Sequence, residues 1–148
     1  MEQVTVKKTL KTNYLIVTKY MIETTTQGIK ISVTTVFCGI QEHNQQKHYL
    51  YDYYISIENL SPHTVQLSSR HWEIYDSLNH TEIIEGEGVV GVQPIIKPTE
   101  KHTYKSHCIL LSNCGSMKGY YTMLNLDETK KFKAMIPSFQ LLTKTVLN

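Results

Sequence analysis

The chain has 148 residues and a mass of 17.1 kDa, the size of one domain, and none of its apolar runs is long enough to cross a bilayer. No apolar block follows the first lysines, so we expect no secretory signal, no membrane partner and a cytoplasmic location. Four lysines against one glutamate give residues 1–20 a balance of +3, which leaves −1 of the net +2 for the rest. That remainder holds one arginine, Arg70, and no excess of positive charge. We therefore expect no nucleic-acid partner, because the neutralisation of phosphates by Lys and Arg supplies most nucleic-acid affinity.

The first part of the chain alternates apolar and polar side chains at period two, the pattern of half-buried β-strands. We predict strands over Gly28–Phe37 and Tyr49–Ile57, because their odd-numbered positions are mostly apolar. The polar stretch Gly39–Lys47 between them, rich in Gln and His, is predicted to be an exposed hairpin loop.

A third predicted strand changes the parity of its apolar face. Val65 and Leu67 are apolar at odd positions, whereas Trp72 and Ile74 continue at even ones. A slip of one residue would turn the apolar face outward, so Ser68–Arg70 is predicted to hold a bulge, a bend or a change of sheet.

The second half of the chain also indicates strands and no sustained helical period. We predict strands over residues 81–85, 102–110, 119–126 and 132–136, with a last edge strand over 138–143 after the interruption at Pro137. His102, Tyr104, Ser106, Cys108 and Leu110 are expected to line one face of their strand. About seven or eight short strands predict an all-β fold, either a two-sheet sandwich or a barrel.

Many spaced residues carry a family resemblance. They are Ile57–Asn59, Val65–Leu67, Arg70–Trp72, Glu85–Pro94, Pro98, Glu100, Tyr104, Ser106, Gly115–Met117, Gly119, Tyr121–Met123 and Ile136–Leu141. On these residues the chain, from about residue 28 to its C-terminus, resembles the ApaG family. The resemblance implies an immunoglobulin-like or fibronectin-III-like β-sandwich of two antiparallel sheets. It also implies a link to cobalt and magnesium resistance, and related domains act as attached interaction modules.

One position departs from the family pattern. Thr99 stands between Pro98 and Glu100, where the family usually has Gly. Because Thr disfavours positive φ, we predict a type I turn here rather than type II.

The N-terminal residues lie outside the resemblance. We therefore divide the chain into an extension, residues 1–20, and an ApaG domain, residues 21–148, with Met21 able to serve as the start of the domain. The competing interpretation is an added edge strand, because Tyr14–Val17 has strong β propensity.

The segment Glu85–Pro94, called the glycine loop below, is the main candidate site. Gly86, Gly88 and Gly91 formally fit GxGxxG, but Pro94 follows instead of a helix that would present amides to a pyrophosphate. The alternatives are a crossover between sheets, an anion nest and a partner surface. We expect positive φ at Gly88 or Gly91, where Val would cost about 1 kcal/mol or more.

Other constellations are weaker. Glu85 and Glu87 suit a hard cation, but without an Asp-rich ladder we predict no metal site and no cofactor. The three cysteines show no CxxC spacing and are interpreted as buried or half-buried free thiols. Arg70 and Trp72 are predicted to share a face, with the guanidinium near a ring or a carboxylate or, alternatively, with Trp72 in the core.

No catalytic motif is visible, so we predict a non-enzymatic binding module that holds an unidentified protein partner. Its candidate contact residues are Arg70, Trp72, Gly86, Glu87, Gly88, Gly91 and Gln93. The alternative is a small ligand at the glycine loop, either a phosphate-containing molecule such as pyrophosphate or a dinucleotide, or a divalent cation. Hydrolysis of a dinucleotide is a third hypothesis, and a homodimer is the alternative assembly.

Overall fold

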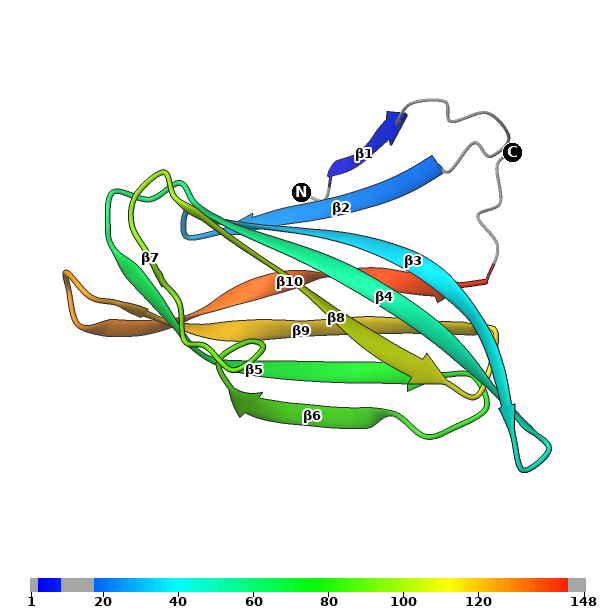
Figure 1. Ribbon diagram of the computed structural model, residues 1–148. Helices are drawn as coiled ribbons and strands as arrows, with labels where there is room; N and C mark the ends of the chain where they lie inside the picture. The colour runs from blue at the N-terminus through cyan, green and yellow to red at the C-terminus, as the bar shows by residue number, and fades with distance from the viewer. Residues whose placement is uncertain (1–2, 9–17, 144–148) are drawn as a thin grey trace.

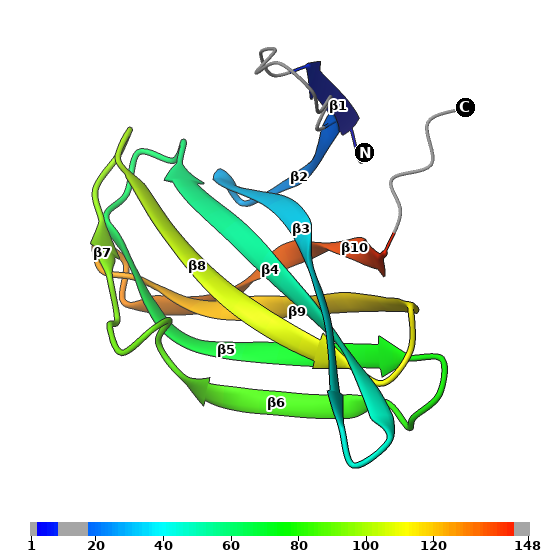
Figure 2. The same ribbon diagram turned by 45° about the vertical axis from the view of Figure 1, so that its right-hand side comes forward.

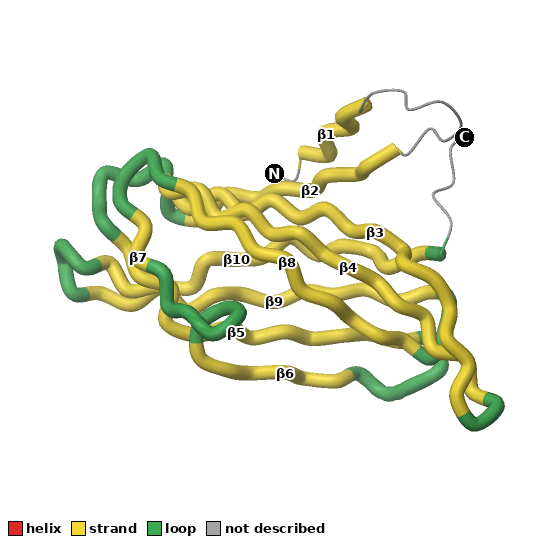
Figure 3. Tube along the Cα trace, in the orientation of Figure 1, coloured by secondary structure: helices red, strands yellow, loops and turns green. Residues whose placement is uncertain are grey.

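The computed structural model describes residues 3–8 and 18–143, and in this part of the chain it is an antiparallel β-sandwich (Figure 1). The described residues form ten strands and no helix, so they contain no membrane-spanning helix. The two sheets lie face to face as separate layers (Figure 3). The predicted all-β sandwich is confirmed, with more strands than the seven or eight expected.

Each sheet has five strands. The first sheet has the order β1 (Gln3–Lys8), β2 (Thr18–Thr26), β3 (Ile29–His43), β4 (Gln46–Asn59) and β8 (Lys101–Leu110). The second has the order β10 (Lys130–Leu142), β9 (Cys114–Asn125), β5 (Val65–Asp76) and β6 (Glu82–Glu87), with the short β7 (Ile95–Ile96) paired to β5. Strands β6 and β8 are therefore edge strands, one in each layer (Figure 1).

The core lies between the sheets, and the predicted alternation places its side chains there. The odd-numbered apolar residues at the start of β3 and along β4 are buried, as are Trp72 of β5 and Tyr121 of β9. The even-numbered residues of β8 face the same core, which confirms the face predicted for that strand. Periodicity of two is a local property of the chain, so it assigns faces without knowledge of the partner strands.

The predicted irregularity in β5 is confirmed as a bulge. The pairing of β5 with β9 shifts register between Leu67 and Ser69, which moves Trp72 onto the buried face. A second shift lies between Ile136 and Phe139 of β10, on either side of Pro137. The prediction of a separate last strand is wrong, because this bulge at the sheet edge accommodates Pro137 and β10 continues to Leu142.

The predicted exposed hairpin over Gly39–Lys47 exists, but the prediction that this stretch is a loop is wrong. Strands β3 and β4 pair as far as His43 and Gln46, and only Asn44 and Gln45 form the turn, at φ 50° and 63°. The end of this hairpin projects from the sandwich (Figure 2), so its side chains are exposed on both faces. Strand pairing uses backbone hydrogen bonds and does not require an apolar face. The polar composition of this stretch therefore gave no alternation from which its strands could be predicted.

The predicted type I turn at Thr99 is wrong. Thr99 has φ 71°, and Glu100 N donates to Lys97 O at 3.0 Å, which makes the turn type II with Pro98 at its second position. Asn59 holds this geometry from outside, because Thr99 N donates to its carbonyl at 2.8 Å and its own N donates to Glu100 O at 3.0 Å.

We expect Thr99→Gly to raise the free energy of unfolding by about 1 kcal/mol, because glycine removes the strain of a β-branched residue at positive φ. The increase is checked by chemical denaturation. Thr122→Gly in β9, at a residue without positive φ, is the control and should lower stability. Loss of stability in both variants would contradict the strain at Thr99.

Near the N-terminus, β1 pairs with the first part of β2, from Thr18 to Glu23. An N-terminal edge strand therefore exists, but it is formed by Gln3–Lys8, and the predicted strand over Tyr14–Val17 lies outside the described residues. The division of the chain at residue 20 stays a prediction. Pairing of β2 with β3 begins at Met21, opposite Thr34.

A chain that begins at Met21 retains every β2–β3 pair, so we expect it to melt within a few degrees of the full chain and to stay soluble. Thermal unfolding of the two proteins side by side checks this. A clear drop in melting temperature would mean that β1 belongs to the stable fold.

Asp76, at the end of β5, ties this strand to the β8–β9 turn. Its carboxylate is 5% exposed and accepts hydrogen bonds from Ser112 Oγ at 2.6 Å, Leu111 N at 2.7 Å and Leu78 N at 3.1 Å. Burial raises the pKa of Asp76, but the bonds from Ser112, Leu111 and Leu78 outweigh it, so the pKa lies below its ordinary value.

A lowered folded-state pKa means that Asp76 stabilises the fold at neutral pH and that this contribution is lost as acidification protonates the carboxylate, below about pH 4. We expect Asp76→Asn to lower the free energy of unfolding by about 1–3 kcal/mol at pH 7. The NH2 group of Asn would face one of the N–H or O–H groups that donate to the carboxylate in the native protein. Its free energy of unfolding should also depend less on pH in the acid range than that of the native protein. Denaturation curves at a series of pH values measure both effects, and parallel pH profiles would contradict this role.

Candidate functional site

The glycine loop connects β6 to β7 and contains a small hairpin of its own. Val89 N donates to Val92 O at 2.8 Å, and Val92 N donates to Val89 O at 3.1 Å. The two residues between them, Val90 and Gly91, have φ 45° and 77°, the signs that a type I′ turn requires. Gly88 has φ 60°, so positive φ is confirmed at both predicted glycines.

Arg70 holds the base of the glycine loop. Its Nη1 donates to Glu87 O and Gly88 O, both at 2.9 Å, so the guanidinium binds main-chain carbonyls rather than the ring or carboxylate that we expected. Gly86 lies opposite Arg70 on β6, and a Cβ there would be 2.8 Å from Nη2. Glycine at this position leaves the space that the guanidinium occupies.

Two glutamines and two main-chain bonds connect the glycine loop to the bulge of β5. Gln93 Nε2 donates to Ser68 O at 2.9 Å, and Gln66 Nε2 donates to Gln93 O at 3.2 Å. Gly88 N also donates to Ser68 O, at 2.9 Å, and Leu67 N donates to Pro94 O, at 3.0 Å. The structure thus brings Arg70, Gly86, Glu87, Gly88 and Gln93 together, and their polar groups hold the loop in place.

Trp72 lies apart from this group, in the core. It is 2% exposed, and its ring packs against Tyr53, Tyr121 and Phe139 at centroid distances of 5.5, 6.4 and 5.9 Å. Arg70 and Trp72 share the inner face of β5, as predicted, but only Arg70 reaches the loop. The alternative interpretation, with Trp72 in the core between the sheets, agrees with this position.

The electrostatics of the glycine loop do not favour an anion. The amides of Gly88, Val89 and Val92 already donate within the protein. Glu85 Oε1 lies 2.6 Å from His71 Nδ1, and Glu87 is exposed beside it. A phosphate would meet these carboxylates and find few free donors.

Other chemistry is sparse in the described part of the chain. Residues 21–143, whose side chains the structure describes, contain no group of three His, Cys, Asp or Glu side chains placed to hold a metal ion. Cys38, Cys108 and Cys114 are free thiols, as interpreted, but only Cys108 is buried. The expected burial of Cys38 and Cys114 is wrong, because both are exposed. Burial raises the pKa of Cys108 to about 12, which keeps it protonated and unreactive at neutral pH.

The tip of the glycine loop presents apolar side chains to solvent. Val90 is 65% exposed, Val92 is 49% exposed, and Ile95 just beyond the loop is 55% exposed. We did not predict these residues as contacts. The sequence signal for this exposed tip was the pair Val-Gly at the centre of a two-residue turn, where Asn-Gly is the preferred pair.

Known proteins match most of this chain. Residues 39–125 match the family described as the ApaG domain. Protein ApaG of Brucella canis is 36% identical over 121 residues, covering 82% of this chain and 92% of that protein. Protein ApaG of Shewanella sediminis is 40% identical over 121 residues, covering 82% of this chain and 95% of that protein.

Solved structures also match the fold. An X-ray structure of a structural genomics target superimposes with a TM-score of 0.76 at 34% identity, covering 81% of this chain and 90% of that chain. A crystal structure described as an ApaA protein from Bordetella pertussis superimposes with a TM-score of 0.73 at 32% identity, covering 80% of this chain and 95% of that chain.

Proposed function

This chain belongs to the ApaG family, and we propose that it is a non-enzymatic binding module that holds a protein partner at the tip of its glycine loop. The observation that carries this proposal is Val90, a β-branched residue at φ 45° with 65% of its surface exposed.

Val90 is unfavourable for the isolated fold. A β-branched residue in the left-handed region costs about 1–2 kcal/mol, and an exposed side chain recovers none of this through the core. Burial of a valine against a partner stabilises a complex by about 1.5–3 kcal/mol, enough to offset that strain. Strain at an exposed apolar tip therefore supports a contact surface.

The charged residues near the tip indicate what kind of partner surface to expect. Glu85 and Glu87 are exposed at the end of β6, shortly before the apolar residues Val90 and Val92 in the chain. A complementary surface combines an apolar pocket with lysine or arginine at its rim.

Val90→Asn is the sharpest test. Asn suits a type I′ turn, so this variant should keep or gain stability while it loses the apolar tip. We expect immobilised native protein to retain a partner that the Val90→Asn protein does not. Leu78→Asn removes a side chain that is 71% exposed in another turn and serves as the control, which should retain the partner. Equal retention by all three proteins, or by none, would sink the proposal.

Calorimetry tests the alternative small-ligand function at the same loop. Pyrophosphate, diadenosine tetraphosphate, magnesium and cobalt are titrated into the native protein, and we expect no heat of binding because the loop amides and Arg70 are engaged internally. Saturable heat that disappears on mutation of the loop would favour the ligand hypothesis. Sedimentation of the native and Val90→Asn proteins separates a homodimer from a different partner.

A further inference from the structure

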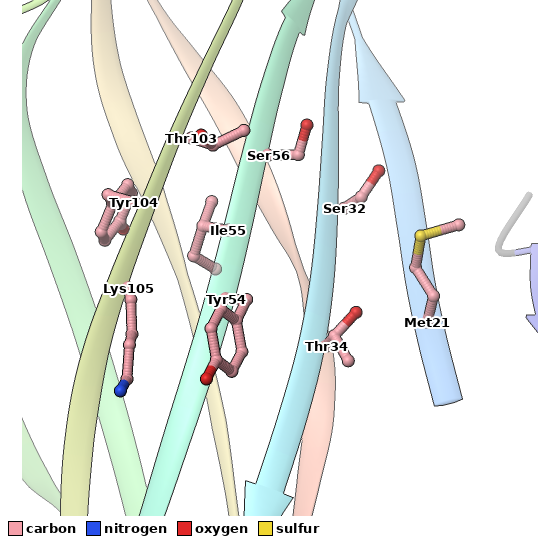
Figure 4. A pocket seen from close by; sticks show the side chains of 9 residues that line it. All are labelled: Met21, Ser32, Thr34, Tyr54, Ile55, Ser56, Thr103, Tyr104 and Lys105. Atoms are coloured by element: carbon pink, nitrogen blue, oxygen red, sulfur yellow. The ribbon is translucent and has the colours of Figure 1, made fainter. Parts of the chain in front are cut away.

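A groove lies on the outer face of the first sheet (Figure 4), whereas the glycine loop belongs to the second sheet. It has a volume of about 410 Å³, within the range of about 300–1,000 Å³ for small-molecule sites. Side chains of β2, β3, β4 and β8 line it, so it crosses four strands.

The strand register explains why this face is hollowed. Ser32, Ser56 and Thr103 lie opposite one another on β3, β4 and β8, and they form a row of small side chains across the sheet. The neighbouring row contains Thr34, Tyr54 and Lys105 in the same register, and it is larger on β4 and β8. The row on the other side contains Lys30, Glu58 and Lys101. A trench of hydroxyl groups therefore runs between two taller rows.

The groove contains a few hydroxyl groups that both donate and accept hydrogen bonds, and the rest of its accessible lining is mostly apolar. Ser32 Oγ donates weakly to Glu23 Oε2 at 3.4 Å. Ser56 and Thr103 make no side-chain hydrogen bond to any residue that the structure describes, so their hydroxyls remain available to a bound molecule.

The charges around the groove balance one another. Lys30 Nζ lies 3.5 Å from Glu23 Oε2, and Lys105 Nζ lies 3.0 Å from Asp52 Oδ2. Glu58 and Lys101 are opposite each other in the β4–β8 ladder. With each lysine facing a carboxylate, the groove has no excess charge for an ionic ligand, and its surroundings favour a neutral one.

Tyr54 supplies an aromatic wall. Its side chain is 42% exposed, and Lys105 Nζ lies 5.7 Å from the centroid of its ring. The face of an aromatic ring carries partial negative charge and attracts polarised C–H groups as well as cations. A sugar ring has such C–H groups on its faces and hydroxyls at its edge.

From the hydroxyl trench, the balanced charges and the aromatic wall, we infer that this groove binds a neutral polyhydroxylated ligand, that is, a saccharide. The ligand packs its C–H face on Tyr54 and exchanges hydrogen bonds with Ser56 and Thr103. This function goes beyond the partner contact at the glycine loop, because the two sites lie on different sheets.

The test titrates isotope-labelled native protein with maltose, cellobiose and chitobiose at millimolar concentration, followed by amide chemical shifts. We expect at least one disaccharide to shift the amides of Ser32, Ser56 and Thr103. Tyr54→Ala, and Thr103→Val, which keeps the shape but removes the hydroxyl, should each weaken that binding about tenfold or more.

Three controls keep the test decisive. Tyr75→Ala removes a tyrosine that is 51% exposed on the second sheet and should bind like the native protein. Val90→Asn should also bind normally, which separates this site from the glycine loop. Thermal melts confirm that Tyr54→Ala and Thr103→Val are folded. No shift with any disaccharide, undiminished binding in Tyr54→Ala, or shifts caused only by glucuronate or phosphate would each overturn the inference.

Discussion

Replacement of Gly88 by Ala will lower the free energy of unfolding by about 3 kcal/mol, a large effect for one methyl group. The added Cβ would lie 2.1 Å from Val92 O, a contact that real Cβ atoms do not make, and Gly88 also has φ 60°. The carbonyl is already the acceptor for Val89 N in the loop hairpin. Relief of the clash therefore breaks the hairpin, and urea denaturation measures the loss.

Gly91 provides the matched control for this prediction. It has φ 77°, but a Cβ there would have no heavy atom within 4 Å. Gly91→Ala therefore carries backbone strain without a clash, and we expect a loss of about 1 kcal/mol. Equal losses for the two variants would mean that the close approach to Val92 costs nothing, and the account of Gly88 would be wrong.

Asn59→Ala is expected to cost about 3–5 kcal/mol, because it leaves several buried polar groups without partners. Asn59 is 0% exposed, and its Nδ2 donates to His63 O at 2.7 Å and to Ile96 O at 2.9 Å. Its Oδ1 accepts from Ser61 N at 3.0 Å and from Ser61 Oγ at 2.6 Å. One amide thus connects β4, β7 and the turn between β4 and β5.

Ser61→Ala is the control for Asn59. It removes only hydroxyl bonds in the same turn and should cost about 1 kcal/mol. Chemical denaturation of the two variants gives the difference directly. If Asn59→Ala were no more harmful than Ser61→Ala, the buried amide would not be the connection that the geometry describes. The long-range bond from Asn59 to Ile96 spans 37 residues and has no local signal in the sequence.

For the candidate site, the sequence predicted the backbone geometry of the glycine loop, whereas the loop's role as a binding site stays a prediction. Positive φ at Gly88 and Gly91 followed from residue type, because few other residues adopt that conformation. The role of Arg70 depended on carbonyls 17 and 18 residues away, and the exposed position of Val90 depended on hydrogen bonds that close the hairpin around it. The contact of Arg70 has no local signal, whereas the pair Val-Gly was a local signal of the turn at Val90.

For the fold, alternation alone determined which faces of β3, β4 and β8 are buried, and the change of parity before Trp72 located a bulge. These properties are local, because successive side chains in a strand point to opposite sides whatever the partner strand is. The tertiary structure decided the turn at Thr99, where Asn59 holds a positive φ that threonine disfavours. It also decided the register that lines up Ser32, Ser56 and Thr103, because pairing between strands depends on backbone bonds across the sheet.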